Sequence, residues 1–328
     1  MPVRLNSLPL QLFILVLFTV TSLSLFAADI SVKLRLQWKH QFEFAGFYAA
    51  KEQGYYADLG LDVELLEYEN GLRIVDEVSA GGVEFGIWGS GLIERAMLGD
   101  DIVLLANYFK RSPLALAVSP EISFPSELEG KTLMVSESDI ASANYLQMFE
   151  TFNVDTSKIN FVEPSFTIDE FTAGEVDGVS IFLTNEPYLL KRAGVPYNVI
   201  DPSNYGVDLY DVNLFTSKDY AEEHPTEVEA FIEASNRGWQ YALDNPEELV
   251  DIILAKYNTQ NKSREHLIYE AQQTVRMMQA KSYPIGSIDE EQVNRIGNLF
   301  TEVGLVDRRL AESFIFRVVE PEIALTPS

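Results

Sequence analysis

The chain alternates between two hydrophobic rhythms as far as residue 216. Val32, Leu34 and Leu36 alternate with polar neighbours, which is the period of a strand with one buried face. From residue 44 to residue 56 the apolar positions recur at helical spacing, and Gly54 is a typical helix stop. Strand and helix patterns go on alternating, which predicts βαβ units and an α/β fold with mostly parallel sheets flanked by helices. The predicted strands cover 31–36, 61–67, 83–88, 102–106, 114–118, 132–135, 159–162, 178–182 and 213–216, and the helices between them cover 45–53, 74–80, 92–98, 141–149, 168–173 and 186–193.

The pattern changes after residue 222, where the apolar positions follow helical spacing almost throughout. Pro225 and Pro246 suit the first turns of two of these helices. An earlier break falls at 119–129, where two prolines and weak periodicity indicate a boundary between two compact units. The predicted C-terminal helices cover 225–244, 246–257, 264–279 and 290–303.

The amino terminus has the order of a secretory signal. Arg4 precedes an apolar run over 8–26, and Ala27 and Ala28 follow it. We expect residues 1–28 to be a signal peptide that is cleaved, although an uncleaved membrane anchor is the alternative. No second apolar run has spanning length, so we expect the mature protein to be soluble and periplasmic.

The net charge and the scarcity of cysteine and histidine argue against several classes of function. The sequence has 24 basic and 50 acidic residues, a net charge of −26, which argues against binding to nucleic acid or to anionic membranes. It also favours neutral or cationic ligands over anions. The chain has no cysteine, and His40, His224 and His266 lack the spacing of zinc ligands, so we expect neither a metal site nor a cofactor.

Five segments together resemble one protein family. They are 38–65, which begins WKHQFEFAGFY, and 85–116, 175–190, 204–217 and 224–254. The chain resembles the thiamine-pyrimidine-synthase-like, or SsuA-like, branch of periplasmic substrate-binding proteins. Members of this branch are related to the pyrimidine-binding and sulfonate-binding components of ABC importers.

This resemblance implies a two-lobed periplasmic binding protein of type II. We expect residues 29–118 to form the first part of lobe 1 and residues 119–212 to form lobe 2. Residues 213–328 would supply a return strand and helices that pack back on lobe 1.

The first candidate ligand residues follow the first strand. Trp38 and His40 lie at its carboxyl end, where open α/β folds place their ligands. Tyr48 is a further candidate, one helical turn after Phe44. The phenylalanines of this stretch, Phe42, Phe44 and Phe47, are better explained as core residues.

A second set comes from the loop GIWGSG. Glycines allow close approach of backbone N–H groups to a ligand, and a serine adds a hydroxyl group. Such turns also simply join strands to helices, but the resemblance to the family loop selects Trp88, Gly89 and Ser90.

A third set comes from EVDGVSIFLTNEP. Relatives that bind aminopyrimidines hydrogen-bond the amino group through acidic or amide side chains, which points to Asp177, Asn185 and Glu186. Glu186 is our first choice for that role. The alternative is that Asn185 and Glu186 cap the helix that opens at Pro187.

The fourth set lies in YGVDLYD, where Tyr205 and Asp208 are expected to close the cleft from the second lobe. Relatives usually have glycine and then aspartate after the second tyrosine. Here Tyr210 is followed directly by Asp211, which leaves the role of Asp211 open. Trp239 also matches the family, but its helical spacing indicates a core residue.

The function that the resemblance implies is that of a monomeric, non-enzymatic extracytoplasmic binding protein for a small heteroaromatic. The ligand expected is a thiamine precursor, hydroxymethyl- or formylaminomethyl-aminopyrimidine, delivered to an ABC transporter permease. The alternative partner is a membrane sensor protein, a histidine kinase or a diguanylate cyclase, which we expect to be a separate chain.

Two other function classes stay open. Eukaryotic members of the family are pyrimidine synthases, but these carry a cysteine-rich motif and are cytosolic, whereas this chain has no cysteine and begins with an export signal. A protein-interaction module with an empty cleft is the other class, and it would bind no small molecule.

Overall fold

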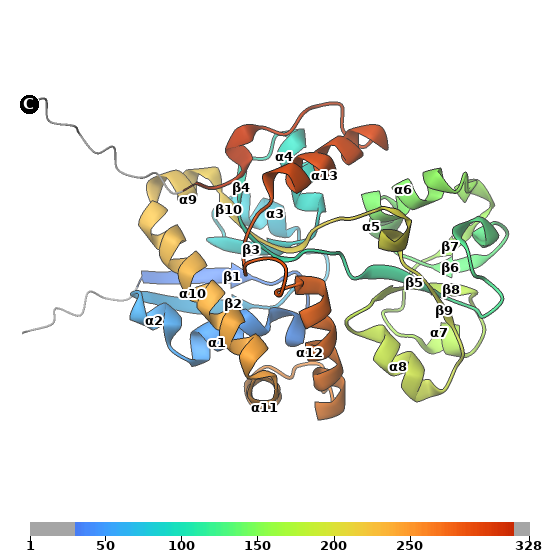
Figure 1. Cartoon of the computed structure of the whole chain (residues 1–328), viewed down its shortest axis with the longest axis horizontal. Helices are drawn as coiled ribbons and strands as arrows, with labels where there is room; N and C mark the ends of the chain where they lie inside the picture. Colours follow the sequence, from blue (N-terminus) through green and yellow to red (C-terminus); the bar gives the residue numbers. More distant parts are fainter. Residues whose placement is uncertain (1–29, 318–328) are drawn as a thin grey trace, which may run out of the picture.

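The computed structural model describes residues 30–317 and has two lobes, each built on a five-stranded sheet (Figure 1). The strand order of the first sheet is β2-β1-β3-β10-β4, with β10 antiparallel to both of its neighbours. Its strands are β1 (Ile30–Arg35), β2 (Leu61–Leu66), β3 (Phe85–Trp88), β4 (Ile102–Phe109) and β10 (Asp211–Ser217). The prediction of α/β lobes with mostly parallel strands is confirmed for β1, β2 and β3.

The second sheet has the order β7-β6-β8-β5-β9. Strands β6, β7 and β8 run parallel, and β5 is antiparallel to β8. The strands of this lobe are β5 (Leu114–Val118), β6 (Thr132–Met134), β7 (Asn160–Val162), β8 (Gly178–Phe182) and β9 (Asn198–Ile200).

Helices cover both sheets. Those of the first lobe are α1 (Ala45–Glu52), α2 (Tyr55–Asp58), α3 (Ile74–Ser79), α4 (Gly91–Leu98), α9 (Lys218–Glu223), α10 (Pro225–Asp244), α11 (Pro246–Lys256), α12 (Arg264–Met278) and α13 (Glu290–Glu302). Those of the second are α5 (Glu137–Ile140), α6 (Ala143–Thr151), α7 (Asp169–Thr172) and α8 (Glu186–Ala193). The sequence predicts one helix at 141–149, whereas the structure has two, because the Ser136 side chain caps the short α5 by accepting from the Asp139 amide.

Two crossovers connect the lobes, at 110–113 and 201–210. The sequence places the first boundary after residue 118, but the structure places β5 in the second sheet, so the chain leaves lobe 1 after Phe109. Every β5 residue pairs with β8 across the second sheet, and this pairing carries the strand into that lobe. The return strand likewise begins at Asp211 rather than at residue 213, because Asp211 already pairs with Phe109.

The C-terminal helices pack on lobe 1, as the family resemblance implies. Gly46 of α1 and Gly238 of α10 let the two helices approach closely, since a Cβ on Gly46 would lie 2.1 Å from the Trp239 ring. Trp239 is fully buried between Phe47 and Tyr108, which confirms its prediction as a core residue. Phe47 is also fully buried, as are Phe42 and Phe44, so their prediction as core residues is confirmed.

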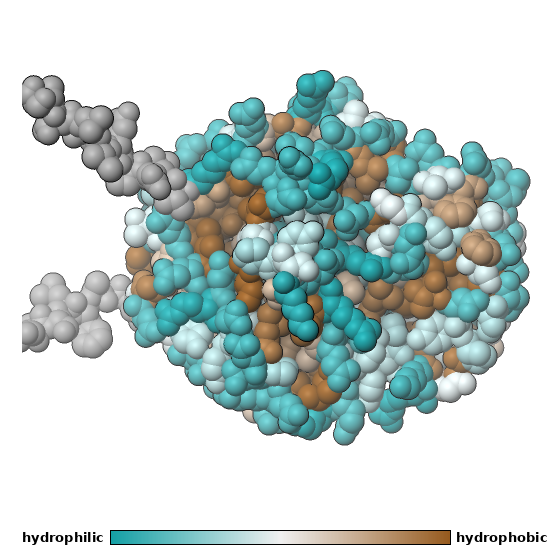
Figure 2. Space-filling model, viewed as in Figure 1, coloured by the Kyte–Doolittle hydropathy of each residue, from teal (hydrophilic) through white to brown (hydrophobic). Residues whose placement is uncertain are grey.

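The surface of the molecule is mainly polar on the face shown in Figure 2. Hydrophilic side chains cover most of this face, and hydrophobic side chains are visible among them. Over residues 30–317, no helix has both the length and the hydrophobicity needed to cross a bilayer. The expected signal peptide, residues 1–28, lies outside the described residues.

Candidate functional site

The loops that follow the parallel strands of both sheets meet between the lobes. β4 runs parallel to β3 and leads into the first crossover, so the carboxyl ends of β1 and β3 face lobe 2. In lobe 2, Leu114 follows the same crossover and pairs with Phe182, the last residue of β8. The carboxyl ends of both sets of strands therefore border the same interlobe space, where α/β folds bind ligands.

Lys262 connects the two lobes across this space. Its Nζ donates to Gln41 Oε1 at 2.9 Å in lobe 1 and to Asn185 Oδ1 at 2.9 Å in lobe 2. It also pairs with the Glu270 carboxylate, and the two side chains are only 6% and 2% exposed. The second oxygen of Glu270 accepts from the Phe42 amide at 2.9 Å. The ammonium group is therefore almost fully enclosed by polar groups from three segments.

Two further carboxyl groups lie beside this pair and share one amide donor. Gln37 Nε2 donates to Glu43 Oε1 at 2.7 Å and to Asp211 Oδ1 at 3.0 Å. Glu43 also accepts from Gln41 Nε2 at 3.0 Å, and Asp211 accepts from Ser112 Oγ at 3.2 Å. Asp211 thus connects the return strand, the first crossover and the loop after β1.

We call this group of side chains the interlobe cluster. Its members are Gln37, Gln41, Glu43, Asn185, Glu186, Asp211, Lys262 and Glu270.

The interlobe cluster contains four carboxyl groups and a single ammonium group. Burial, and after it the neighbouring Asp211 carboxyl group, raise the pKa of Glu43 to about 8. Burial also raises the pKa of Asp211, Glu186 and Glu270. Excess carboxyl groups in a desolvated site attract a cation or a ligand rich in hydrogen-bond donors.

Lys110, on the first crossover, has another ammonium group, but this group donates its hydrogen bonds to backbone carbonyl oxygens. Its Nζ donates to the Asn107 carbonyl at 3.0 Å and to the Ser287 carbonyl. Burial lowers the pKa of Lys110 to about 8. This lysine therefore does little to balance the carboxyl groups of the interlobe cluster.

Two buried polar atoms at the site have no protein partner. Gln37 Oε1, an acceptor, and Thr184 Oγ1, a hydroxyl oxygen that can donate or accept, are enclosed without a hydrogen bond. Thr184 directly precedes Asn185, two residues after the end of β8. Unpaired buried groups of this kind are suited to hydrogen bonds with a bound molecule.

Trp38 lies at the edge of the interlobe space. Its ring stacks on Tyr68, with centroids 5.5 Å apart, and faces Phe166 of lobe 2 at 5.9 Å. Phe166 is 69% exposed and has a positive φ of 61°, which is unusual for a large side chain. An aromatic surface from each lobe therefore meets at this edge.

His40 and Tyr48 lie deeper in lobe 1. His40 Nδ1 is 2.9 Å from the Tyr48 hydroxyl oxygen, and Tyr48 stacks on Tyr257 with centroids 4.3 Å apart. Tyr48 is fully buried. The structure brings these two residues together with Tyr257 and does not bring them into the interlobe cluster.

The loop Trp88-Gly89-Ser90 borders the interlobe cluster. A Cβ on Gly89 would lie 3.4 Å from Asp211 Oδ2, so the backbone passes directly beside this carboxyl group. Trp88 and Ser90 are half-buried. The structure thus brings the second predicted set next to Asp211.

The structure separates the residues of the third predicted set, Asp177, Asn185 and Glu186. Glu186 Oε2 accepts from the Phe182 amide at 2.8 Å and Oε1 accepts from Asn185 Nδ2 at 2.5 Å, so Glu186 holds the turn between β8 and α8. The alternative of a side-chain cap is not confirmed, because no side chain in the described part of the chain accepts from the free amides at the start of α8. Asp177 lies at the opposite end of β8, where it accepts from the Thr132 amide at 2.8 Å. The length of strand β8 separates Asp177 from the interlobe cluster.

Tyr205 and Asp208 lie on the second crossover, on its α6 and α13 side. Tyr205 packs edge-on against Phe152 of lobe 2, with centroids 4.8 Å apart. The Asp208 carbonyl accepts from Gln292 Nε2 of α13 at 2.6 Å. Neither residue hydrogen-bonds to the interlobe cluster.

Sequence reasoning missed most of the interlobe cluster. Gln41 and Glu43 lie within the WKHQFEF run, where polar residues next to phenylalanines are the available signal. Lys262 and Glu270 lie in the helical tail, more than two hundred residues further along the chain. No local pattern in the tail marks them, because only the fold brings this segment to the interlobe space.

Residues 41–249 match the family described as NMT1/THI5 like. The formylaminopyrimidine-binding protein of Halalkalibacterium halodurans is 24% identical over 272 residues, covering 80% of this chain and 82% of that protein.

Solved structures show the same fold at low sequence identity. The periplasmic aliphatic sulphonate binding protein SsuA from Escherichia coli superposes with a TM-score of 0.65 at 14% identity, covering 90% of this chain and 97% of that one. The desulfurization enzyme DSZB superposes with a TM-score of 0.59 at 13% identity, covering 85% and 94%. These likenesses confirm the predicted binding-protein fold, and they show that an enzyme also uses it.

Proposed function

Because the chain belongs to the NMT1/THI5-like family, whose model matches residues 41–249, we propose that it is a non-enzymatic binding protein for a thiamine pyrimidine precursor. The ligand proposed is hydroxymethyl- or formylaminomethyl-aminopyrimidine, held in the interlobe cluster. The formylaminopyrimidine-binding relative, which aligns over 80% of this chain, supports this ligand class.

The observation that carries the proposal is the excess of buried carboxyl groups between the lobes. An aminopyrimidine offers an exocyclic amine and a ring nitrogen that can take a proton, and carboxylates recognise both. Glu43, Asp211 and Glu270 come from lobe 1, whereas Glu186 comes from lobe 2. A ligand that donates to both sides would favour the closed arrangement of the lobes.

The same charges disfavour a sulfonate ligand. A sulfonate group carries a negative charge, and it would face four carboxyl groups with Lys262 as the ammonium partner in the interlobe cluster. Burying an anion in such surroundings is unfavourable. The structural likeness to a sulphonate-binding protein, at 14% identity, therefore bears on the fold and not on the ligand.

Aromatic side chains at the edge of the site suit a flat ring. Trp38 and Tyr68 from lobe 1 and Phe166 from lobe 2 present ring faces next to each other. Stacking on such faces provides contact area, while the polar cluster provides orientation.

The proposed partner is a membrane protein that recognises the closed form. An ABC transporter permease is the first choice, and a membrane sensor protein such as a histidine kinase or diguanylate cyclase is the alternative. Export to the periplasm through the signal-like residues 1–28 is part of the proposal.

A thermal-shift panel tests the ligand. Hydroxymethyl-aminopyrimidine, thiamine, taurine and nucleobases are compared, and the aminopyrimidine alone is expected to raise Tm. At about 100 times its dissociation constant it adds about 2.7 kcal/mol of stability. The Trp38→Ala and Glu186→Gln variants should lose the shift, whereas Phe124→Ala, at an exposed aromatic residue of lobe 2, should keep it.

The proposal is contradicted if hydroxymethyl-aminopyrimidine does not raise Tm, or if taurine raises Tm more than hydroxymethyl-aminopyrimidine does. Recovery of the aminopyrimidine with unchanged mass after long incubation supports a binding protein. A changed mass would instead indicate an enzyme.

A further inference from the structure

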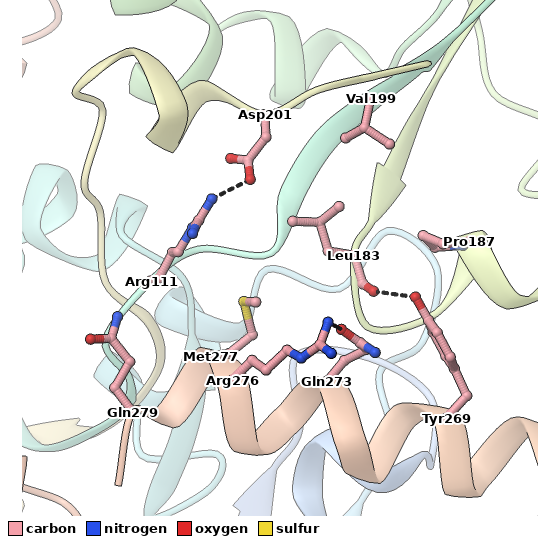
Figure 3. Close-up of a pocket in the computed structure, with 10 residues that line it drawn as sticks. All are labelled: Arg111, Leu183, Pro187, Val199, Asp201, Tyr269, Gln273, Arg276, Met277 and Gln279. Carbon is pink, nitrogen blue, oxygen red and sulfur yellow. Dashed lines mark hydrogen bonds and ion pairs between the residues drawn. The ribbon is translucent and has the colours of Figure 1, made fainter. Parts of the chain in front are cut away.

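A separate cavity of about 520 Å³ lies where both crossovers meet α12 (Figure 3). Arg111 from the first crossover and Asp201 from the second border it, and Gln273 and Arg276 of α12 form its floor in this view. Leu183 enters from lobe 2. No side chain of the interlobe cluster lines this cavity. We call it the crossover cavity.

The charges of the crossover cavity differ in sign from those of the interlobe cluster. Arg111 pairs with the Asp201 carboxylate, but its Nε is buried and has no hydrogen-bond partner. Arg276 Nη1 donates to Gln273 Oε1 at 3.1 Å, which uses only one of its five N–H groups. Two guanidinium groups thus face one carboxylate, so the cavity has a positive charge in excess.

Guanidinium groups with free N–H donors recognise carboxylate and phosphate groups. Next to them, Leu183, Pro187 and Val199 provide an apolar wall from lobe 2. The volume is in the range that binds small organic molecules.

From this combination we propose that the crossover cavity binds a small organic anion that bears a carboxylate or a phosphate group. The proposal goes beyond the aminopyrimidine function and does not depend on it. The bound anion contacts α12 of lobe 1, the β8–α8 segment of lobe 2 and both crossovers at once. It therefore favours one relative arrangement of the lobes and is coupled to whatever binds between them.

Binding is tested on the full mature chain with two probes, succinate and inorganic phosphate, at an ionic strength matched with sodium chloride. The readout is Tm and the dissociation constant by calorimetry. The wild type is expected to show a saturable shift with at least one probe. Succinate alone would identify a carboxylate site, and phosphate alone would identify a phosphate site.

Three variants assign the binding to the cavity. Arg276→Gln removes one charge at an exposed position of α12 and should weaken binding at least ten-fold. Arg111→Lys keeps the charge beside Asp201 but removes the guanidinium and should weaken binding as well. Arg309→Gln makes the same charge change at an exposed position that does not line the cavity and should leave binding unchanged. A saturable shift that is equal in Arg276→Gln and in the wild type overturns the proposal, as does the absence of any shift beyond that of sodium chloride.

Discussion

At the residue scale, the main feature is a carboxyl group buried beside other carboxyl groups. Glu43 receives hydrogen bonds from Gln37 and Gln41, yet burial and Asp211 raise its pKa to about 8. A carboxyl group with this pKa is largely protonated at neutral pH. Binding of a cation to the interlobe cluster should then release a proton.

This shift predicts a pH dependence of stability. The pKa of Glu43 is higher in the folded protein than the ordinary value of 4.5, so the folded state binds more protons than the unfolded state between these values. The contribution of Glu43 to stability is therefore fully present below about pH 4.5 and is lost as the pH rises to about 8. Since each pKa unit corresponds to about 1.4 kcal/mol, the loss is at most about 5 kcal/mol.

Urea unfolding of wild type and Glu43→Gln at pH 5 and pH 8.5 measures this contribution. The wild type should lose more stability than the variant over this range, since glutamine does not titrate. Glu64→Gln, at an exposed position of β2, is the matched control and should behave as the wild type. Parallel pH profiles for wild type and Glu43→Gln would show that Glu43 titrates normally.

Lys262 gives a second prediction. Lys262→Met removes the ammonium group from a buried pair and leaves Glu270 without its charged partner. Breaking a buried pair in this way costs about 3–5 kcal/mol, measured as the free energy of unfolding in urea at pH 8. The cost should shrink as the pH falls, because burial raises the pKa of Glu270 and the protonated carboxyl group has no charge to compensate.

The control for this change is Lys281→Met, which removes an exposed ammonium group after α12. It should alter stability by less than about 0.5 kcal/mol. Equal effects of the two variants would mean that the Lys262–Glu270 pair contributes nothing specific.

At the element scale, helix α10 depends on a close approach to α1. Gly46→Ala places a Cβ 2.1 Å from the Trp239 ring, which is fully buried and has no room to move. We expect this change to destabilise the protein by 3 kcal/mol or more on an order-of-magnitude scale, or to prevent folding. Circular dichroism during thermal unfolding measures the effect.

Gly297→Ala is the matched control, because it also changes a helical glycine to alanine. Its Cβ would meet Met97 Sδ at 3.5 Å, an ordinary contact, and alanine favours the helix by up to about 1 kcal/mol. This variant should be neutral or stabilising. If Gly46→Ala were equally tolerated, the proposed packing of α1 on α10 would be wrong.

Local patterns predicted the elements better than their assignment to lobes. The helix at 225–244 was predicted with the bounds that the structure has for α10, because Pro225 and the long apolar stripe mark it. The sequence indicates a lobe boundary after residue 118, because prolines cluster there, yet β5 already pairs with β8. Pairing between distant strands is a tertiary property, which hydrophobic periodicity does not contain.

The same dependence on tertiary structure explains which residues of the site the sequence could indicate. The strand-end rule for open α/β folds points to Trp38, and the family resemblance points to Trp88, Gly89, Asn185 and Glu186. These residues lie at or soon after the ends of β1, β3 and β8. Lys262 and Glu270 belong to the helical tail and reach this space only because the tail packs back on lobe 1.

At the scale of the whole molecule, the two lobes are joined by two crossovers and by side chains that span the space between them. Lys262 reaches Asn185, and the Tyr269 hydroxyl donates to the Leu183 carbonyl at 3.1 Å. Tyr188 of lobe 2 also lies with its hydroxyl oxygen 3.2 Å from Ser263 Oγ and stacks on His266, with ring centroids 4.4 Å apart. These contacts are among those that opening would break.

Ligand-dependent closure can be measured cleanly because the chain has no cysteine. Spin labels at Glu64→Cys in lobe 1 and Glu175→Cys in lobe 2, both exposed positions, report the distance between the lobes. Addition of aminopyrimidine should narrow the distance distribution by electron-electron resonance. A distribution that is unchanged at saturating ligand would argue against closure around the ligand.

The central claim is that the carboxyl groups between the lobes recognise an aminopyrimidine, and calorimetric titration of hydroxymethyl-aminopyrimidine into wild type and Asp211→Asn tests it most directly. Asparagine has the same shape and can keep the contacts to Gln37 and Ser112, so the variant removes mainly the charge. We predict one site in the wild type and at least ten-fold weaker binding in Asp211→Asn. Equal affinity of the two proteins, or no binding to either, would contradict the claim.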